Sequence, residues 1–418
     1  MLNGECQLPG DKSISHRVLM FSAIAQGTST VQNLNTGADV LATQKALQQL
    51  GVKFSEKNGL LHIHGMGFGH FKSDNNALKL DCENSGTTAR LLCGLLAKQP
   101  FDITLVGDAS LTKRPMKRLV SALAPFGVNI QLASSHGDPN DFPVQILKNT
   151  QLKSANITLP VASAQLKSAC ILAALQAEGQ SHILEPLPSR DHTERLLKLY
   201  GANIQHENNT VRVQKSKLQA IDFTVPGDPS SAAFLIVMAL LCEGSDFTIK
   251  NMGLNPTRIG YISVLRAMGA NIEITCDDPN AYEPVGNVRV RTSRLIACNV
   301  KRELIPNVID ELPILMIAAS CASGVSHFEG IAELRLKESD RIETMIQGLR
   351  ALSIQCKSTE DSVTLQGGKF QTGTVNSFDD HRIAMSFLCA KRISNLPIEV
   401  LNTDCIATSF PEFLEFVK

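Results

Sequence analysis

The sequence predicts an α/β protein of two domains, built from a unit of roughly 70 residues that recurs about six times. The length of 418 residues exceeds one ordinary hydrophobic core. Apolar, helix-like segments with polar first residues recur along the whole chain. Shorter segments between them end at a glycine and lead into an alternating strand. The apolar segments start at residues 11, 84, 163, 228, 310 and 379.

The six apolar segments are predicted to be buried helices. Each opens on Asp, Asn or Ser, whose side chains accept hydrogen bonds from the free amides of a helix N-terminus. The intervening segments are predicted to be helices that stop at a left-handed glycine. Four of them close on "QLGV", "PFGV", "LYGA" and "AMGA", and "GLRALSIQC" at 348–356 is a weaker fifth copy.

The tripeptide "PGD" occurs twice, at 9–11 and 226–228, and divides the units into two sets of three. We expect residues 1–11 and 227–418 to form one discontinuous domain and residues 12–226 to form the other. A helix N-terminus carries unpaired amides and a partial positive charge. The cleft between the domains would attract anions if each domain directs its three helix starts towards the other. We therefore predict an active site in the inter-domain cleft.

Composition argues against several classes of partner. Forty basic residues balance forty acidic ones, so no general basic field exists to hold nucleic acid or an anionic membrane. The longest apolar run, 232–242, is too short to span a bilayer, and the N-terminus does not resemble a signal peptide. The eleven cysteines have no C-x-x-C spacing, as expected of reduced thiols in the cytoplasm. We expect a cytoplasmic monomer with no metal site.

Charged and hydroxyl side chains gather at the starts of the repeated helices, where arginine and lysine suit carboxylate and phosphate groups. Taken singly, the first of these segments is equally well explained as a solvated helix start. The segment at 333–345 is equally well explained as an exposed helix, on which the spacing of Lys337 and Arg341 would place both on one face. The segment at 378–385 is harder to explain as surface, and Arg114, which precedes a proline, is expected to be extended or in a turn. Their shared position favours one site for strongly anionic substrates. The residues concerned are Lys12, Ser13, Arg17, Gly86, Arg114, Ser163, Gln165, Lys167, Arg190, Lys337, Glu338, Arg341 and Arg382.

Nine motifs, in order along the chain from about residue 5 to residue 416, resemble those of the 5-enolpyruvylshikimate-3-phosphate synthases. They are "PGDKSISHR", "NSGTTARLL", "GDASLTKRPM", "ASAQLKSA", "RDHTERLL", "VPGDPSSAAF", "NPTRIG", "LKESDRI" and "DHRIAMSF". "ASAQLKSA" with "SRDHTE" is similar to the class II branch of the family.

The resemblance implies the two-domain enolpyruvyl transferase fold, an inside-out α/β barrel with three βαβαββ repeats in each domain. It implies transfer of the carboxyvinyl group of phosphoenolpyruvate to the 5-hydroxyl of shikimate 3-phosphate by addition and elimination, with release of phosphate and without a cofactor. This reaction belongs to the shikimate pathway towards chorismate and the aromatic amino acids. Domain closure over the two substrates is expected.

The resemblance also implies residue roles. Asp310 would be the general base on the 5-hydroxyl, Glu338 the proton donor to the methylene carbon, and Lys12 an aid to the leaving phosphate. The contacts to shikimate 3-phosphate would come from Lys12, Ser13, Arg17, Ser163, Gln165, Arg190, Asp310 and Lys337. Those to phosphoenolpyruvate would come from Lys12, Gly86, Arg114, Gln165, Arg341 and Arg382.

The chain departs from the family pattern at two places. Glu83 stands where glycine is common, and Ala407 and Thr408 stand where some members carry an active-site lysine. Two alternative functions predict other residues. The sister transferase acting on UDP-N-acetylglucosamine would show a Lys-Asn pair near the start and a cysteine in the "GDASLTKRPM" loop. A non-catalytic anion-binding relative would have lost Asp310 or Glu338, and both are present.

Overall fold

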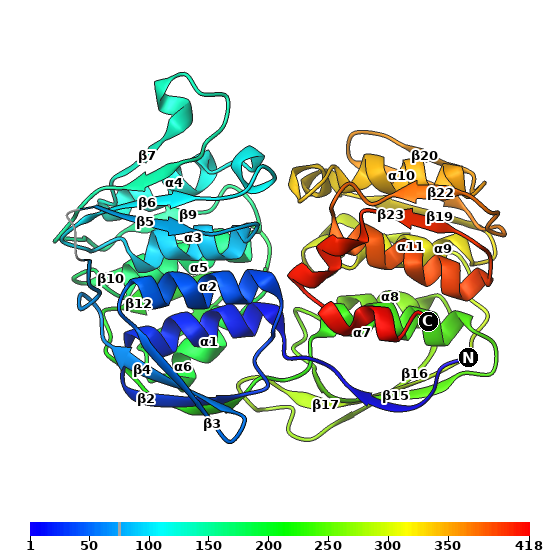
Figure 1. The fold of residues 1–418 in the computed structure, drawn as a ribbon, viewed down its shortest axis with the longest axis horizontal. Coiled ribbons are helices and arrows are strands. Elements are labelled where there is room, and N and C mark those ends of the chain that lie inside the picture. The colour runs from blue at the N-terminus through cyan, green and yellow to red at the C-terminus, as the bar shows by residue number, and fades with distance from the viewer. Residues whose placement is uncertain (74–76) are drawn as a thin grey trace. The chain divides into compact units, whose positions relative to one another are not determined.

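The computed structural model describes residues 1–73 and 77–418 and divides them into two compact units (Figure 1). Unit 1 comprises Met1–Asp11 and Pro226–Lys418, and unit 2 comprises Lys12–Val225. Each unit has its own hydrophobic core. The chain therefore passes from one unit to the other twice, directly after the first "PGD" and directly before the second.

Unit 2 contains three sheets, and two of them share one strand order. The middle sheet runs β5-β6-β8-β7 and the last runs β9-β10-β12-β11. The first two strands of each are parallel and connected by a buried helix, whereas the last two form an antiparallel pair. The elements are β5 (Ala77–Asp81), α3 (Gly86–Leu95), β6 (Asp102–Val106), α4 (Lys117–Leu123), β7 (Ile130–Leu132), β8 (Val144–Ile146), β9 (Asn156–Thr158), α5 (Ala164–Ala174), β10 (Gln180–Leu184), α6 (His192–Leu199), β11 (Ile204–Glu207) and β12 (Thr210–Gln214).

The first sheet of unit 2 takes its parallel partner from the far end of the unit. β13 and β14 pair with β2, which continues to β4 and β3. The elements are α1 (Lys12–Ile24), β2 (Ala25–Gln32), α2 (Ala38–Gln49), β3 (Lys53–Lys57), β4 (Leu60–Met66), β13 (Leu218–Gln219) and β14 (Asp222–Thr224).

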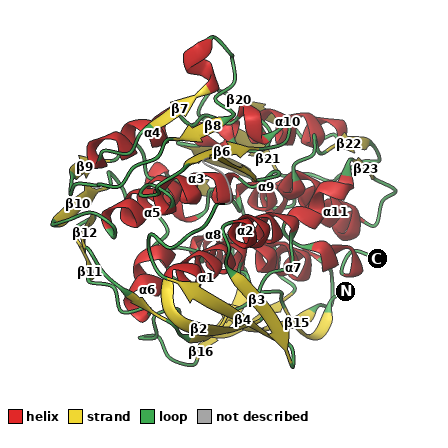
Figure 2. Cartoon of the chain, turned by 60° about the vertical axis from the view of Figure 1, so that its left-hand side comes forward, coloured by secondary structure: helices red, strands yellow, loops and turns green. Residues whose placement is uncertain are grey.

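Unit 1 repeats the same order twice and then stops early. Figure 2 shows its last strand, β23, beside α11. Its sheets run β1-β15-β17-β16 and β18-β19-β21-β20, and the third holds only the parallel pair β22-β23 among the described residues. The sixth repeat therefore ends after its second strand, and two 3₁₀ helices follow. The elements are β1 (Asn3–Gln7), α7 (Pro229–Leu241), β15 (Asp246–Gly253), α8 (Gly260–Ala267), β16 (Asn271–Cys276), β17 (Val285–Arg291), β18 (Asn299–Val300), α9 (Leu312–Ser320), β19 (Val325–Glu329), α10 (Arg341–Ala351), β20 (Cys356–Ser358), β21 (Ser362–Gln366), β22 (Thr374–Asn376), α11 (His381–Ser394) and β23 (Glu399–Leu401).

The two "PGD" segments lie side by side in unit 1. Gly10 and Gly227 form an antiparallel bridge. The Asp11 amide donates to the Pro226 carbonyl at 2.8 Å, and the Asp228 amide donates to the Pro9 carbonyl at 3.1 Å. Each segment follows a first strand and leads into an apolar helix, β1 into α1 and β14 into α7. The repeats thus explain why the tripeptide occurs twice.

The apolar helices form the core of each unit. In unit 2 α3 packs against α1 and α5, and in unit 1 α7, α9 and α11 pack against one another. A helix surrounded by protein is apolar on every side, as in α7, where every residue from Pro229 to Leu240 is buried. All six predicted apolar helices are present. No helix among the described residues has both the length and the apolar character needed to cross a membrane.

The predicted helix ends are also confirmed. A glycine with φ between 82° and 91° stands at each of four helix ends. These are Gly51 after α2, Gly127 after the 3₁₀ turn that follows α4, Gly201 after α6, and Gly269 after α8. Such angles favour glycine. In the weaker fifth copy Ser353 takes this conformation, with φ 64°.

The predicted caps Ser163 and Asp228 are confirmed, whereas α3 and α11 are capped one residue after the predicted Asn84 and Asp379. The side chains of Ser85, Ser163, Asp228 and Asp380 accept hydrogen bonds from the first turns of α3, α5, α7 and α11. The expectation is wrong for α9, whose N-cap position holds Glu311 without a side-chain cap bond. Asp310 has other partners, described below.

Candidate active site

In unit 2, the first two turns of α1 hold three of the predicted site residues. Lys12 forms an ion pair with Asp39 of α2. Arg17 is buried and donates to the Ser13 carbonyl at 2.9 Å, as expected for residues four apart on a helix. Its other nitrogens donate to two hydroxyls at 2.7 Å, those of Thr193 and Ser168. Arg17 therefore ties the start of α1 to α5 and α6.

The starts of α3 and α5 are connected by side-chain hydrogen bonds. Arg90 Nη1 donates to Gln165 Oε1 at 3.1 Å, and Gln165 Nε2 donates to Thr87 Oγ1 at 3.0 Å. A Cβ atom added at Gly86 would lie 2.6 Å from Arg90 Nη1 and 3.1 Å from Arg114 Nη1. Glycine here lets two guanidinium groups approach the backbone of the first turn of α3.

Arg114 lies in an extended conformation before Pro115, as the sequence predicted, with φ −80° and ψ 134°. Its Nη2 donates to Asn84 Oδ1 at 2.7 Å and to Ser110 Oγ at 3.2 Å. The guanidinium is thereby held beside the N-terminus of α3. Positive charge and free helix amides at one place favour an anion.

Ser163 and Arg190 complete the predicted set in unit 2. Ser163 Oγ accepts from the Leu166 amide at 3.4 Å and caps α5. Arg190 is half-buried in the segment between β10 and α6, and the neighbouring Ser189 is buried. Both residues border helices whose first turns carry other predicted ligands.

In unit 1, a second group surrounds Asp310. Lys337 Nζ lies 3.2 Å from Asp310 Oδ1, Arg341 Nη1 lies 3.4 Å from the same oxygen, and Arg382 Nη2 lies 3.9 Å from Oδ2. Arg382 Nη1 also donates to the Asp310 carbonyl at 2.8 Å. Three cations this close stabilise the carboxylate form of Asp310.

Arg341 is the centre of this second group. It is buried, donates to Glu338 Oε2 at 2.6 Å, and makes two bonds to the buried Asp380 at 2.7 and 3.2 Å. Burial alone lowers the pKa of a guanidinium, but the negative charges of Asp380 and Glu338 outweigh it, so the pKa of Arg341 is raised further. Arg341 therefore stays charged at any working pH.

The spacing of Lys337 and Arg341 predicted one shared helix face, and this is wrong. Lys337 is extended, with φ −87° and ψ −157°, and α10 begins only at Arg341, capped by Asp340. Lys337 and Arg341 meet through Asp310 of another segment and not along a helix. Lys337 and Glu338 thus belong to the segment that connects a 3₁₀ helix to α10 and lie on neither helix.

Sequence comparison places the chain among known proteins. The EPSP synthase family (3-phosphoshikimate 1-carboxyvinyltransferase) matches residues 1–417. The chain belongs to the EPSP synthase family. A 3-phosphoshikimate 1-carboxyvinyltransferase of Coxiella burnetii is 45% identical over 420 residues, covering 100% of this chain and 94% of that protein. The corresponding protein of Halorhodospira halophila is 44% identical, with 100% and 93% covered.

Solved structures agree with this membership. An EPSP synthase from Acinetobacter baumannii has a TM-score of 0.85 and 42% identity, covering 99% of this chain and 94% of that one. The enolpyruvyl transferase NikO from Streptomyces tendae has a TM-score of 0.77 at 15% identity, covering 100% and 94%. The second likeness concerns the fold alone. The two-domain enolpyruvyl transferase fold predicted from the sequence is confirmed.

The structure shows the backbone conformation and contacts at both departures from the EPSP synthase pattern, Glu83 and Thr408. Glu83 has φ 50°, a left-handed conformation that explains why glycine suits the position. Its side chain is exposed and pairs with Lys45 at 2.7 Å, so its charge is partly balanced there. Thr408 Oγ1 donates to the Cys405 carbonyl at 2.8 Å within a 3₁₀ helix. This hydroxyl is bound to the backbone and does not replace a lysine.

Three contact residues were missed in the sequence. Arg90 holds Gln165, and it lies four residues after Gly86 within a motif already singled out. Asp39 pairs with Lys12 and Asp380 with Arg341. Asp380 belongs to the motif that supplied Arg382, but Asp39 had no local signal. A carboxylate partner distant in sequence becomes apparent only once the chain has folded.

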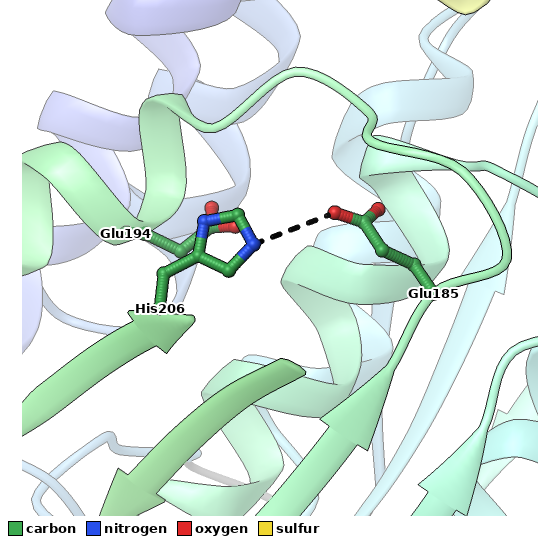
Figure 3. Close-up of side chains that lie close together, drawn as sticks. All are labelled: Glu185, Glu194 and His206. Carbon is green, nitrogen blue, oxygen red and sulfur yellow. Dashed lines mark ion pairs between the residues drawn. The ribbon is translucent and has the colours of Figure 1, made fainter. Parts of the chain in front are cut away.

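One group of residues in the described part of the chain has the ligand types of a metal site: Glu185, Glu194 and His206 (Figure 3). The ammonium of Lys167 lies 2.8 Å from Glu185 Oε1 and 2.8 Å from Glu194 Oε1. This buried cation already balances the carboxylates, so the group does not suit a metal ion. The predicted absence of a metal or cofactor stays a prediction.

Proposed function

We propose that the protein transfers the carboxyvinyl group of phosphoenolpyruvate to the 5-hydroxyl of shikimate 3-phosphate and releases phosphate. The observation that carries the proposal is the match of the EPSP synthase family to residues 1–417. The basic residues and Glu338 that such chemistry requires stand in motifs that resemble those of the family, and Asp310 is also present in the chain. Nothing favours the UDP-N-acetylglucosamine transferase or a non-catalytic relative.

In the addition step, the 5-hydroxyl oxygen attacks C2 of phosphoenolpyruvate while C3 receives a proton. Asp310 takes the hydroxyl proton, and its charged form is favoured by Lys337, Arg341 and Arg382. Glu338 supplies the proton to C3. The product of this step is a tetrahedral adduct that carries a methyl group and the phosphate on one carbon.

In the elimination step, a methyl proton leaves to Glu338 and phosphate departs from C2. The proton that Asp310 took from the hydroxyl leaves with the phosphate, so both carboxyl groups return to their starting states. Lys12 stabilises the charge that develops on the phosphate, which requires its ammonium to turn from Asp39 to the substrate. Each proton lost by a substrate is thus accepted by a named carboxylate. Catalysis rests on orientation and fixed positive charge.

Glu338 must carry a proton before it can donate one. In the structure its carboxylate accepts from Arg341 at 2.6 Å, an arrangement suited to the charged form. We propose that the anionic groups of phosphoenolpyruvate attract Arg341 and weaken this pair. Exclusion of water around Glu338 then favours its protonated form.

The proposed ligands of each substrate come from both units. Lys12, Gly86 and Arg114 for phosphoenolpyruvate belong to unit 2, whereas Arg341 and Arg382 belong to unit 1. We therefore propose that binding of each substrate requires residues of both units. The cytoplasmic location and the monomeric state stay predictions.

A phosphate-release assay with both substrates tests the activity and the two carboxylates. We expect Asp310→Asn and Glu338→Gln each to lower kcat roughly 10²- to 10⁴-fold, with calorimetric binding of shikimate 3-phosphate retained. Glu343→Gln, on the exposed first turn of α10, is the control and should leave kcat unchanged. Absence of turnover in the unmodified protein refutes the activity. Undiminished turnover in both variants refutes only the acid–base roles.

A further inference from the structure

The buried ammonium of Lys167 connects three segments of unit 2. Lys167 lies on α5, its side chain has no exposed surface, and its Nζ contacts Glu185 after β10 and Glu194 on α6. His206 on β11 lies at the edge of the group, with Nε2 3.9 Å from Glu185 Oε1 (Figure 3). Lys167 was one of the charged residues that the sequence placed at the helix starts, but none of these four was assigned a catalytic role or a substrate contact. Their position relative to those residues suggests what they do.

Stability alone is a weak explanation for such a group. Removing a lysine and two carboxylates from water costs free energy that their attraction only partly returns, and apolar replacements are often as stable. An ammonium fixed by two carboxylates does, however, set the geometry of the segments it joins. The other contacts of these three side chains therefore decide between a stabilising and a positioning role.

The group fixes the residue before Arg190 at three atoms. Glu185 Oε2 accepts from Ser189 Oγ at 2.6 Å and from the Ser189 amide at 3.2 Å. Lys167 Nζ lies 3.4 Å from the Ser189 carbonyl. Because both backbone polar groups of Ser189 are held, the direction in which the chain presents Arg190 is held as well.

The neighbours of the group hold Arg17 in the same way. Ser168 follows Lys167 on α5, and Thr193 precedes Glu194 on α6. Their hydroxyls lie 2.6 Å apart, and each accepts a 2.7 Å bond from Arg17. The Lys167 contacts therefore align α5 and α6 where they bind the start of α1.

We propose that Lys167, with Glu185 and Glu194, is a positioning group that presents Arg190 and Arg17 to shikimate 3-phosphate. The inference rests on the function and binding residues proposed above. Lys167 acts through these residues and touches no substrate atom.

The charge state of Lys167 agrees with this role. Burial lowers the pKa of its ammonium, but the charges of Glu194 and Glu185 and their hydrogen bonds outweigh burial and raise the pKa. Lys167 therefore remains protonated at neutral pH. It is a permanent donor and not a general base.

The test compares steady-state kinetics, calorimetric binding and urea unfolding in four single variants. Ser189→Ala removes one hydroxyl from the group, Glu185→Gln removes one charge, and Lys167→Met removes the cation. Gln176→Leu is the matched control. Gln176 lies just beyond the opposite end of α5, and its side chain donates three hydrogen bonds to backbone carbonyls.

We expect Ser189→Ala and Glu185→Gln to raise the KM and Kd for shikimate 3-phosphate roughly three- to tenfold. Their KM for phosphoenolpyruvate and their kcat should stay within about twofold. Lys167→Met should show the larger effect, and should it fail to fold, the other two variants carry the test. Gln176→Leu should lower the urea midpoint and leave both KM values unchanged.

The positioning role is overturned if Ser189→Ala and Glu185→Gln fold and bind shikimate 3-phosphate as the unmodified protein does. It is also overturned if kcat and both KM values worsen together, in proportion to the loss of stability, as expected of a purely structural group. Arg190→Ala separates the two levels of inference. If that variant binds shikimate 3-phosphate with wild-type affinity, Arg190 is not a ligand and the positioning proposal fails, while the proposed reaction stands. An inactive unmodified protein would refute the reaction itself.

Discussion

Replacing Gly86 by alanine should impair function without impairing folding. Gly86 is the first residue of α3 and has no left-handed backbone conformation, so alanine is allowed there. Alanine is the better helix former, by up to about 1 kcal/mol. The added Cβ would, however, lie 2.6 Å from Arg90 Nη1 and 3.1 Å from Arg114 Nη1, where an ordinary contact needs 3.4 Å or more.

The size of the effect follows from which groups must move. The end of Arg90 is flexible and can shift by about 1 Å, but the shift strains its 3.1 Å bond to Gln165. Arg114 must give by a few tenths of an ångström. Both Arg114 and Gln165 are proposed phosphoenolpyruvate ligands. Loss of one hydrogen bond to a charged group costs about 1.5–3 kcal/mol, which corresponds to a roughly 10- to 100-fold higher KM for phosphoenolpyruvate.

The assay is phosphate release at varied concentrations of each substrate, together with thermal unfolding. Gly94→Ala, on the same helix, is the matched control, because its Cβ would lie 2.1 Å from the Ala169 carbonyl of α5. That backbone atom cannot turn aside, so Gly94→Ala should lower stability by about 1–3 kcal/mol with little change in KM. A Gly86→Ala protein with an unchanged KM for phosphoenolpyruvate, or with equal changes for both substrates, would refute the reasoning.

Two further predictions concern stability. The buried Arg258 binds Asp11 at 2.5 Å and Asp228 at 3.2 Å, one aspartate from each "PGD", so Arg258→Met should cost about 3–5 kcal/mol in urea unfolding. Removing the exposed Arg289 should cost nothing measurable, and an equal loss in both variants would contradict this account. Burial raises the pKa of the Cys170 thiol from 9.0 to about 12. Because the folded pKa lies above the unfolded one, the contribution of Cys170 to stability should be constant below pH 9 and fall between pH 9 and 12. The loss of stability over that range should be less steep in Cys170→Ala, and an identical slope would count against this reasoning.

The sequence was sufficient wherever local rules operate. Helix caps such as Ser163, glycine ends such as Gly51 and the extended Arg114 follow from the chemistry of a few neighbouring residues, and all are found in the structure. The same locality misled at Lys337. Charges four apart favoured a helix, whereas the chain is extended there and Lys337 reaches Asp310 from a separate segment.

What the sequence determined by itself was the repeated unit, its buried helices and the set of polar residues at their starts. Only the tertiary structure decided that β1 pairs with β15, over 240 residues away, and that Lys12, Arg341 and Lys167 have Asp39, Asp380, Glu185 and Glu194 as partners. The physical reason is range. Caps, turns and apolar faces depend on contacts within a few residues, whereas strand partners and the counter-charges of buried cations depend on which distant segments the hydrophobic core brings together.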